Sequence, residues 1–312
     1  FPTAFKIRGG LGKVDKLIIN GAECEPYLNG DHLTMLNFPE QLLKGIQLIR
    51  IASGLDHCYY GIEKNKQDAI DLLNSLHPEN YGIEIVPEEV KYPQGGEKMQ
   101  VKAVTGREVK PGGIPSGVGC NVVSTRTAYA IYQACYEGKP VIERIVTVAG
   151  SALKAPVNAL TRVGTPFEYL AEQCGGFVKT PRKIVLGGPM MGICATSFEA
   201  PTIKGTAGVL FFTEEEDRHV EHPTCIRCGK CITVCPMNLE PVFMYMYYNK
   251  GDFEMMQKYH ITDCFECGSC AFNCPARMPL THAFKTAKLM FQAKAAKEKA
   301  AAEAKAAKEA QK

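Results

Sequence analysis

The sequence predicts a multidomain α/β protein. A Rossmann-like parallel sheet is followed by a small β-rich module, an α-helical cysteine-rich domain and a helical tail. Three observations support this fold class. Short apolar runs alternate with helical patterns over residues 1–142, eight of the 14 cysteines fall into two short runs, and residues 281–312 are mostly Ala and Lys. A chain of 312 residues is long enough for two or more domains.

The first domain, residues 1–142, is predicted to be a parallel sheet flanked by helices, because strand and helix patterns alternate along it. We expect strands at Lys16–Asn20, Cys58–Ile62 and Gly82–Val86, and helices at Pro39–Ala52 and Gln67–Leu76. Ligands bind such sheets beyond the carboxyl ends of the strands. The loops Gly21–Pro26 and Lys91–Glu97 are therefore the places where a site is expected.

Composition and charge exclude several classes of protein. The 36 basic and 33 acidic residues leave a net charge of +3, too close to balance to indicate a nucleic-acid partner. We find no apolar run of about 18 residues, so we expect no transmembrane helix. The chain starts abruptly at Phe1-Pro2-Thr3 rather than at Met, and we expect it to be part of something longer.

The two cysteine runs share one pattern, in which three cysteines stand three positions apart and a fourth precedes a proline. The runs are Cys225, Cys228, Cys231 and Cys235, and Cys264, Cys267, Cys270 and Cys274. This is the spacing of bacterial ferredoxins, in which the fourth cysteine ligates the other cluster. We therefore expect one [4Fe-4S] cluster on Cys225, Cys228, Cys231 and Cys274, and a second on Cys264, Cys267, Cys270 and Cys235.

The segment between the runs, Glu240–His260, is helical in its pattern and predicts an α-helical two-cluster ferredoxin domain over residues 209–280. Zinc is the alternative, because pairs of cysteines at this spacing also hold structural zinc. A zinc site needs only four ligands. It therefore does not explain why each run has a third regularly spaced cysteine and a fourth cysteine followed by proline. Two iron–sulfur clusters are therefore the preferred interpretation.

A pair of such clusters carries single electrons, and flavin joins two-electron donors to one-electron acceptors. Five motifs in order resemble the C subunit of the Rnf-type ion-translocating electron transport complex: Phe1–Thr3, Ile19–Tyr27, Tyr92–Lys98, Gly187–Gly192 and the twin cysteine runs. The resemblance implies FMN, two clusters, and NADH or NAD as substrate. It also implies a β-grasp module of the soluble-ligand-binding type over residues 143–208.

The resemblance implies a place in the cell as well. The chain would be a peripheral subunit on the cytoplasmic side of the bacterial inner membrane, bound to other subunits of a membrane complex. That complex would be a ferredoxin:NAD oxidoreductase coupled to ion translocation. No side chain is expected to act as an acid or a base, because the cofactors carry the chemistry.

A more distant resemblance, to the flavoprotein subunit of respiratory complex I, implies roles for single residues. Phe1 and Thr3 would end the loop that covers the flavin, and Lys6 would pair with its phosphate. Glu25 and Glu97 would lie near the nicotinamide. The implied cofactor-binding residues are Thr3, Lys6, Asn20, Glu25, Tyr92, Gly95, Glu97, Ser124 and Thr127.

Other interpretations stay open at this point. The chain could be a soluble flavin and iron–sulfur cobalamin reductase, or a relay that holds clusters and no flavin. Taken alone, Glu23 and Glu25 are two surface carboxylates and Lys6 is a solvated lysine. The tail, residues 281–312, is predicted to be a helix without a core beyond Phe291, either solvated or attracted to an anionic membrane surface or an acidic partner.

Overall fold

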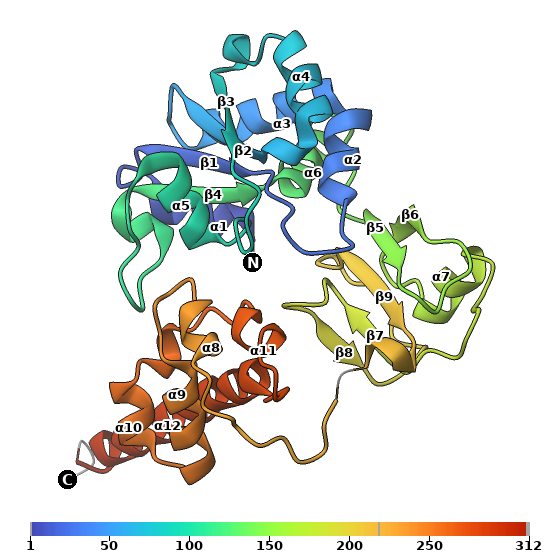
Figure 1. The fold of residues 1–312 in the computed structure, drawn as a ribbon. Helices are drawn as coiled ribbons and strands as arrows, with labels where there is room; N and C mark the ends of the chain where they lie inside the picture. Colours follow the sequence, from blue (N-terminus) through green and yellow to red (C-terminus); the bar gives the residue numbers. More distant parts are fainter. Residues whose placement is uncertain (1, 218, 310–312) are drawn as a thin grey trace. The chain divides into compact units, whose positions relative to one another are not determined.

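The computed structural model describes residues 2–217 and 219–309 (Figure 1). Phe1 and its expected place over the flavin lie outside the described residues. The chain divides into two compact units, residues 1–217 and 218–312. The first unit contains two sheets, and the second is made of helices.

The first sheet of unit 1 has the order β3-β2-β1-β4, and its neighbouring strands are parallel. The strands are β1 (Lys16–Asn20), β2 (Cys58–Glu63), β3 (Ile83–Glu88) and β4 (Cys120–Ser124). The three predicted strands are therefore confirmed. Leu17 and Ile19 pack into one apolar cluster and Ile18 into another, so β1 is buried on both faces, as central strands of parallel sheets are.

Helices cover this sheet and connect its strands. They are α1 (Thr3–Gly10), α2 (Gly30–Asn37), α3 (Pro39–Ala52), α4 (Gln67–Ser75), α5 (Glu97–Thr105) and α6 (Thr125–Tyr136). The predicted helices α3 and α4 are confirmed. A Cβ atom at Gly45 in α3 would lie 2.1 Å from the carbonyl oxygen of Ala128 in α6, so the close packing of these two helices requires glycine at that position.

The second sheet of unit 1 has the order β6-β5-β9-β7-β8 and is mixed, because β5 and β9 are parallel and the other pairs antiparallel. Its elements are β5 (Glu143–Ala149), β6 (Val157–Arg162), α7 (Phe167–Gln173), β7 (Lys183–Leu186), β8 (Ile193–Ala195) and β9 (Gly208–Phe212). The predicted module boundary after residue 208 differs from the structure. The buried strand β9 pairs on both sides within this sheet, so the module continues past it.

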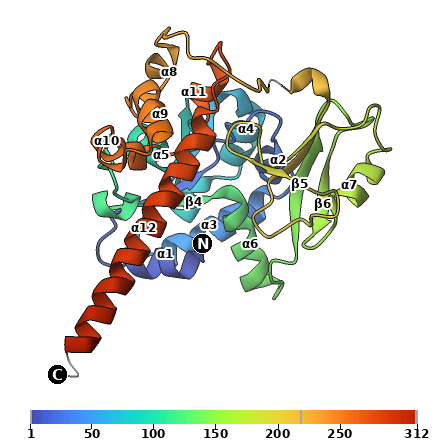
Figure 2. The same ribbon diagram turned by 90° about the horizontal axis from the view of Figure 1, so that it is seen from below.

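Unit 2 contains α8 (Lys230–Thr233), α9 (Pro241–Lys250), α10 (Phe253–Lys258), α11 (Ser269–Phe272) and α12 (Leu280–Glu309). The helical prediction for Glu240–His260 is confirmed. Figure 2 shows α12 as one long helix whose C-terminal part extends beyond the other helices of its unit. Its first turns are not a separate tail, because Leu280, Phe284 and Ala287 are buried in the core of unit 2.

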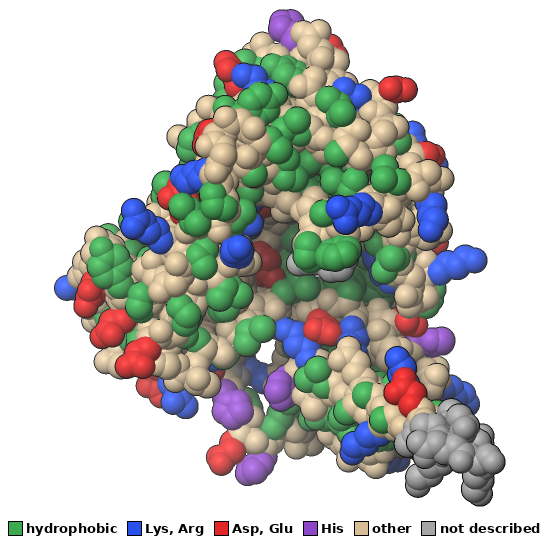
Figure 3. Space-filling view, turned by 180° about the vertical axis from the view of Figure 1, so that it is seen from behind, with side chains coloured by type: hydrophobic (Ala, Val, Ile, Leu, Met, Phe, Trp, Pro, Cys, Tyr) green, Lys and Arg blue, Asp and Glu red, His purple; other side chains and the backbone are tan. Residues whose placement is uncertain are grey.

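Short 3₁₀ turns complete the chain at Lys64–Lys66, Pro78–Tyr81, Pro115–Val118, Glu214–Glu216 and Ile261–Asp263. On the face shown in Figure 3, basic and acidic side chains are scattered among apolar and neutral ones, in keeping with the net charge of +3. Within the described residues, the helices that are long enough to cross a membrane are not apolar enough to do so.

Candidate cofactor-binding sites

The carboxyl edge of the first sheet gathers most of the predicted flavin residues. Asn20 ends β1 and Ser124 ends β4, and the two residues are partners in the register of these parallel strands. The chain then continues into the loop before α2 and directly into α6. Two loops and one helix N-terminus therefore meet where a ligand of a parallel sheet binds.

The turn formed by residues 92–97 closes against the loop that follows β1. Asn20 donates from Nδ2 to the carbonyl oxygen of Gly95 at 2.8 Å, and the amide of Gly95 donates to Sγ of Cys24 at 3.2 Å. A Cβ atom at Gly95 would lie 2.4 Å from the carbonyl oxygen of Ala22. Glycine is therefore required for the turn to approach the sheet edge this closely. Tyr92 is half-buried at the start of the turn.

Lys6 and Glu97 are brought together from α1 and the first residue of α5. Nζ of Lys6 lies 2.6 Å from Oε1 of Glu97 and also donates to the carbonyl oxygen of Val122 at 2.8 Å. The two side chains are 27% and 49% exposed, and an exposed pair of this kind contributes at most about 1 kcal/mol. A phosphate group can therefore replace Glu97 as the partner of Lys6. Thr3, the first residue of α1, is half-buried.

Ser124 and Thr127 stand at the N-terminus of α6, and their hydroxyl oxygens lie 2.8 Å apart. Ser124 occupies the N-cap position in an extended conformation, but within the described chain its side chain makes no capping hydrogen bond to the helix. The first amide groups of α6 are thus left for another acceptor. A helix N-terminus with two hydroxyl groups beside it suits the phosphate or the ribityl chain of a flavin nucleotide.

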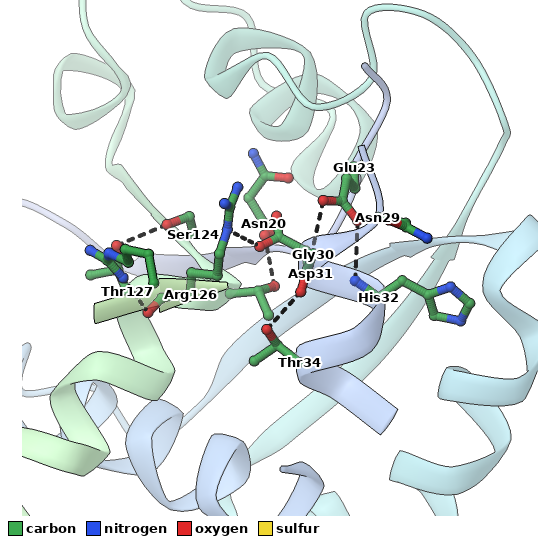
Figure 4. Close-up of polar contacts among 12 residues, drawn as sticks. Asn20, Glu23, Asn29, Gly30, Asp31, His32, Thr34, Ser124, Arg126 and Thr127 are labelled. Carbon is green, nitrogen blue, oxygen red and sulfur yellow. Dashed lines mark hydrogen bonds and ion pairs between the residues drawn. The ribbon is translucent and has the colours of Figure 1, made fainter. Parts of the chain in front are cut away.

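A buried polar network that we did not predict lies beside these residues (Figure 4). The carboxylate of Glu23 accepts hydrogen bonds from the amides of Asp31 and His32, at the start of α2, at 3.0 and 3.1 Å. Arg126 donates from Nε to Asp31 at 2.6 Å. Burial, together with the charge of Asp31, raises the pKa of Glu23 to about 7.

This network ties α2 and α6 together at the sheet edge. Arg126 follows Thr125 and precedes Thr127 in α6, so it belongs to the same turn as the predicted flavin residues. Asp31 and Arg126 stand 95 positions apart, and no local pattern in the sequence pairs them. The only local signal for this pair is that each residue is a charged side chain in the first turn of its helix.

Glu25, predicted to lie near the nicotinamide, contacts the second sheet. Its two carboxylate oxygens accept hydrogen bonds from the amides of Met190 and Met191, at 3.1 and 2.8 Å. These amides belong to the Gly187–Gly192 turn of the second sheet. In this structure Glu25 holds the two halves of unit 1 together, whereas Lys6, Asn20, Gly95, Glu97, Ser124 and Thr127 remain with the first sheet.

In unit 2 the eight cysteines gather into two groups, and each group draws on both runs. One pocket is lined by Cys225, Cys228, Cys231 and Cys274. Another is lined by Cys235, Cys264, Cys267 and Cys270. We name these the open group and the enclosed group, because Cys225 and Cys228 are exposed whereas Cys267 and Cys270 are each only 8% exposed.

The chemistry of these groups fits iron–sulfur clusters. Amides of Leu239 and Met278 donate to Sγ of Cys235 and Cys274, at 3.4 and 3.5 Å, as ligands of such clusters are hydrogen-bonded. Burial raises the pKa of Cys264 to about 11 and that of Cys270 to about 12, so these thiols need metal charge to ionise. Among the described residues, no three Cys, His, Asp or Glu side chains are close enough to hold one metal ion.

Three family models match the chain in succession. The Nuo51 FMN-binding domain matches residues 1–133, the SLBB domain matches residues 145–193, and the 4Fe-4S dicluster domain matches residues 224–278. Each match falls on one of the folded parts described above. The order of the three models is the order of the first sheet, the second sheet and the helical unit.

Curated relatives match over most of the chain. It is 40% identical to the C subunit of the proton-translocating ferredoxin:NAD(+) oxidoreductase complex of Clostridium ljungdahlii, over 80% of this chain and 55% of the relative. It is 38% identical to the C subunit of the Na(+)-translocating complex of Acetobacterium woodii, over 92% of this chain and 65% of the relative. The C subunit of the ion-translocating oxidoreductase complex of Rhodobacter capsulatus is 36% identical, over 92% and 56%. The chain thus spans about half to two thirds of these relatives.

Two solved structures share the fold. They are crystal structures of NAD+-reducing [NiFe]-hydrogenase in the H2-reduced and the air-oxidized state, with TM-scores of 0.58 and 0.59 and identities of 18% and 20%. Each covers 92% of this chain and 50% of the hydrogenase chain. At this identity the likeness shows the fold alone. The curated relatives, together with the FMN-binding family model, show that the chain belongs to the family of C subunits of Rnf-type ion-translocating oxidoreductase complexes.

Proposed function

We propose that this chain transfers electrons between NADH or NAD and the other subunits of a membrane complex. FMN would bind at the carboxyl edge of the first sheet, and two [4Fe-4S] clusters would bind the eight cysteines. The complex would be a ferredoxin:NAD oxidoreductase coupled to ion translocation. We also propose that the chain is a peripheral subunit on the cytoplasmic side of the bacterial inner membrane. The relatives named above are subunits of ion-translocating complexes, which supports its association with a membrane complex.

One observation supports this proposal above the others. A single chain combines a sheet edge suited to a flavin nucleotide with two groups of four thiols. When bound, FMN exchanges a hydride for single electrons and each cluster carries one electron. The flavin would convert the hydride into single electrons, and the two thiol groups would hold the clusters that carry them to a partner.

The residues of the chain bind and orient these groups. Lys6 and the N-terminus of α6 supply positive charge and amide donors for the flavin phosphate. Asn20 fixes the turn of Gly95 beside the sheet edge, where the flat ring system would lie. Glu97, half exposed at the start of α5, can accept hydrogen bonds from hydroxyl groups of the dinucleotide. Proton transfer by a side chain is not required.

Anaerobic purification of the full-length protein that contains this chain tests the proposal. We expect about eight iron and eight sulfide per chain, because each cysteine run supplies the ligand spacing of a cubane. We also expect one FMN, and bleaching of the flavin absorption when NADH is added. Stoichiometric zinc with little sulfide would contradict the clusters. A protein with clusters but no flavin would support only the alternative function, an electron relay.

A further inference from the structure

The two thiol groups have different surroundings. The open group borders a groove of about 690 Å³, whereas the enclosed group borders a space of about 20 Å³. Met244, Phe284 and Leu239 line the enclosed space. Cys225 and Cys228 are exposed, so the open group is the one that a molecule outside unit 2 can approach.

Charge also differs between the two groups, position by position. The cysteine runs repeat, so each residue beside the open group has a counterpart beside the enclosed group. Arg227 corresponds to Glu266, Lys230 to Ser269, and Arg277 to Asn238. Arg277 follows Cys274, so the crossed grouping of the thiols brings it to the same group as Arg227 and Lys230. Arg227 lines the groove of the open group, and Lys230 and Arg277 stand within three positions of its cysteines in the sequence.

These three cations are exposed, and none of them forms an ion pair with another described residue. Their counterpart Glu266, in contrast, pairs with Lys288 at 2.9 Å. The backbone is left-handed at all four corresponding positions, with φ of 56° at Arg227 and 58° at Arg277 against 65° at Glu266 and 53° at Asn238. The two groups therefore share their backbone and differ in charge.

An exposed apolar residue lies among these charges. Ile226 is 64% exposed and lines the groove together with Arg227, Phe243 and Met246. An apolar centre with a charged rim is the usual composition of a protein interface. Interfaces of electron-transfer partners are small and are steered by complementary charge.

We propose that Arg227, Lys230, Arg277 and Ile226 form the docking surface for an acidic one-electron carrier protein, and we name these four residues the cationic surface. The proposal rests on the proposed function, because it requires a cluster at the open group. Exchange across this surface moves one electron and no atoms, so that one partner is oxidised as the other is reduced. Complementary charge orients the carrier so that its redox centre faces the open group.

The same cations have an effect within unit 2. A reduced cluster carries one more negative charge than an oxidised one, and nearby positive charge favours that form. We therefore expect the cluster of the open group to accept electrons more readily than that of the enclosed group. An electron that enters unit 2 would therefore reside mainly on the open-group cluster, next to the cationic surface.

The test uses the full-length protein with its clusters, purified anaerobically, and an acidic bacterial two-cluster ferredoxin as the probe. We expect binding that weakens as salt is added, because exposed charges are screened. The triple variant Arg227→Glu, Lys230→Glu, Arg277→Glu should bind the probe at least about 10-fold more weakly. The matched control, Lys258→Glu, Lys294→Glu, Lys297→Glu, makes the same charge change elsewhere in unit 2 and should bind like the wild type.

A second readout follows the clusters themselves. Electron paramagnetic resonance during a redox titration should show the open-group signal harder to reduce in the Arg227, Lys230, Arg277 variant than in the control. Equal binding by both triple variants would overturn the proposal. So would a wild-type protein that does not bind the probe, or a cationic surface that is needed for anionic phospholipid vesicles and not for ferredoxin. A wild-type protein without iron would instead refute the proposed function, which iron analysis distinguishes.

Discussion

Glu97 is the carboxylate at the sheet edge whose only described ion-pair partner, Lys6, is held by a weak surface contact. We expect Glu97→Gln to lower kcat/KM for NADH-dependent reduction of an artificial acceptor by about 10-fold, which corresponds to about 1.4 kcal/mol of transition-state stabilisation. Iron content should not change, because Glu97 lies in unit 1. Glu84→Gln on β3 is the control. Unaltered NADH kinetics in both Glu97→Gln and Glu25→Gln would remove these residues from the site.

The raised pKa of Glu23 predicts how the stability of the protein depends on pH. Burial raises its pKa from 4.5 to about 7, so between these values the folded chain holds a proton that the unfolded chain has released. The free energy of unfolding should therefore fall as pH rises from about 4.5 to about 7, and level off above. At about 1.4 kcal/mol per pKa unit, the fall is on the order of 3 kcal/mol.

Urea unfolding followed by circular dichroism at several pH values measures this slope. Glu23→Gln should flatten it, because glutamine does not titrate; its single carbonyl oxygen can accept from only one of the amides of Asp31 and His32, so the variant should also be less stable at every pH. His32→Gln, on the same helix, is the control for a neighbouring titratable group. An equal slope in wild type and Glu23→Gln would show that Glu23 is not the responsible group.

The roles of some single residues could be predicted from the sequence, and those of others could not. The cysteines could be identified because their spacing is a local property that repeats. The placement of Glu25 and the pairing of Asp31 with Arg126 could not, because both depend on contacts between segments far apart in the chain. Local patterns do not encode which distant amide or guanidinium a carboxylate will meet.

Among the elements, the turn of residues 92–97 depends on a backbone contact that only glycine allows. Gly95→Ala would place Cβ 2.4 Å from the carbonyl oxygen of Ala22, so the turn must move away from the sheet edge. We expect a loss of about 1–3 kcal/mol of stability and weaker FMN binding, measured by chemical unfolding and by flavin fluorescence. Gly117→Ala is the control, since a Cβ there meets nothing within 4 Å. Equal flavin affinity in both variants would contradict the role of this turn.

The two cysteine runs make a second prediction at this scale. Cys235 follows the first run in sequence but shares a pocket with Cys264, Cys267 and Cys270. Cys235→Ala should therefore perturb the paramagnetic signature of the enclosed-group cluster, and Cys274→Ala that of the open-group cluster. Each change replaces one thiol of four. Assignment of Cys235 to the cluster of Cys225 and Cys228 would refute the crossing and leave two clusters.

Elements with strong periodicity were the most predictable. The strands at Lys16–Asn20 and Cys58–Glu63 and the helix at Pro39–Ala52 follow directly from apolar spacing. Strand β9 was less predictable, because its run of apolar residues gives no sign of the sheet to which it belongs. It pairs with β5 and β7, and only that pairing extends the module beyond residue 208.

For the molecule as a whole, two units with separate cores predict separable fragments. Residues 219–222 are exposed and irregular, and such segments are preferred sites of proteolysis. Mild treatment with a protease of broad specificity should cut there first, leaving all the iron on the C-terminal fragment and the flavin on the N-terminal one. Mass spectrometry and metal analysis of the separated fragments check this. Iron on the N-terminal fragment would contradict the assignment of the clusters to unit 2.

The crossed grouping of the thiols has a consequence for how unit 2 would assemble its clusters and how it would lose them. Each group takes three thiols from one run and one from the other, so neither cubane can be completed until both runs have come together. Binding of two such clusters would add to the folding free energy of unit 2. Assembly of the two cubanes would then be all-or-none. Damage by oxygen at the exposed thiols would release Cys274, loosen the run that holds the enclosed group, and spread from one cubane to the other.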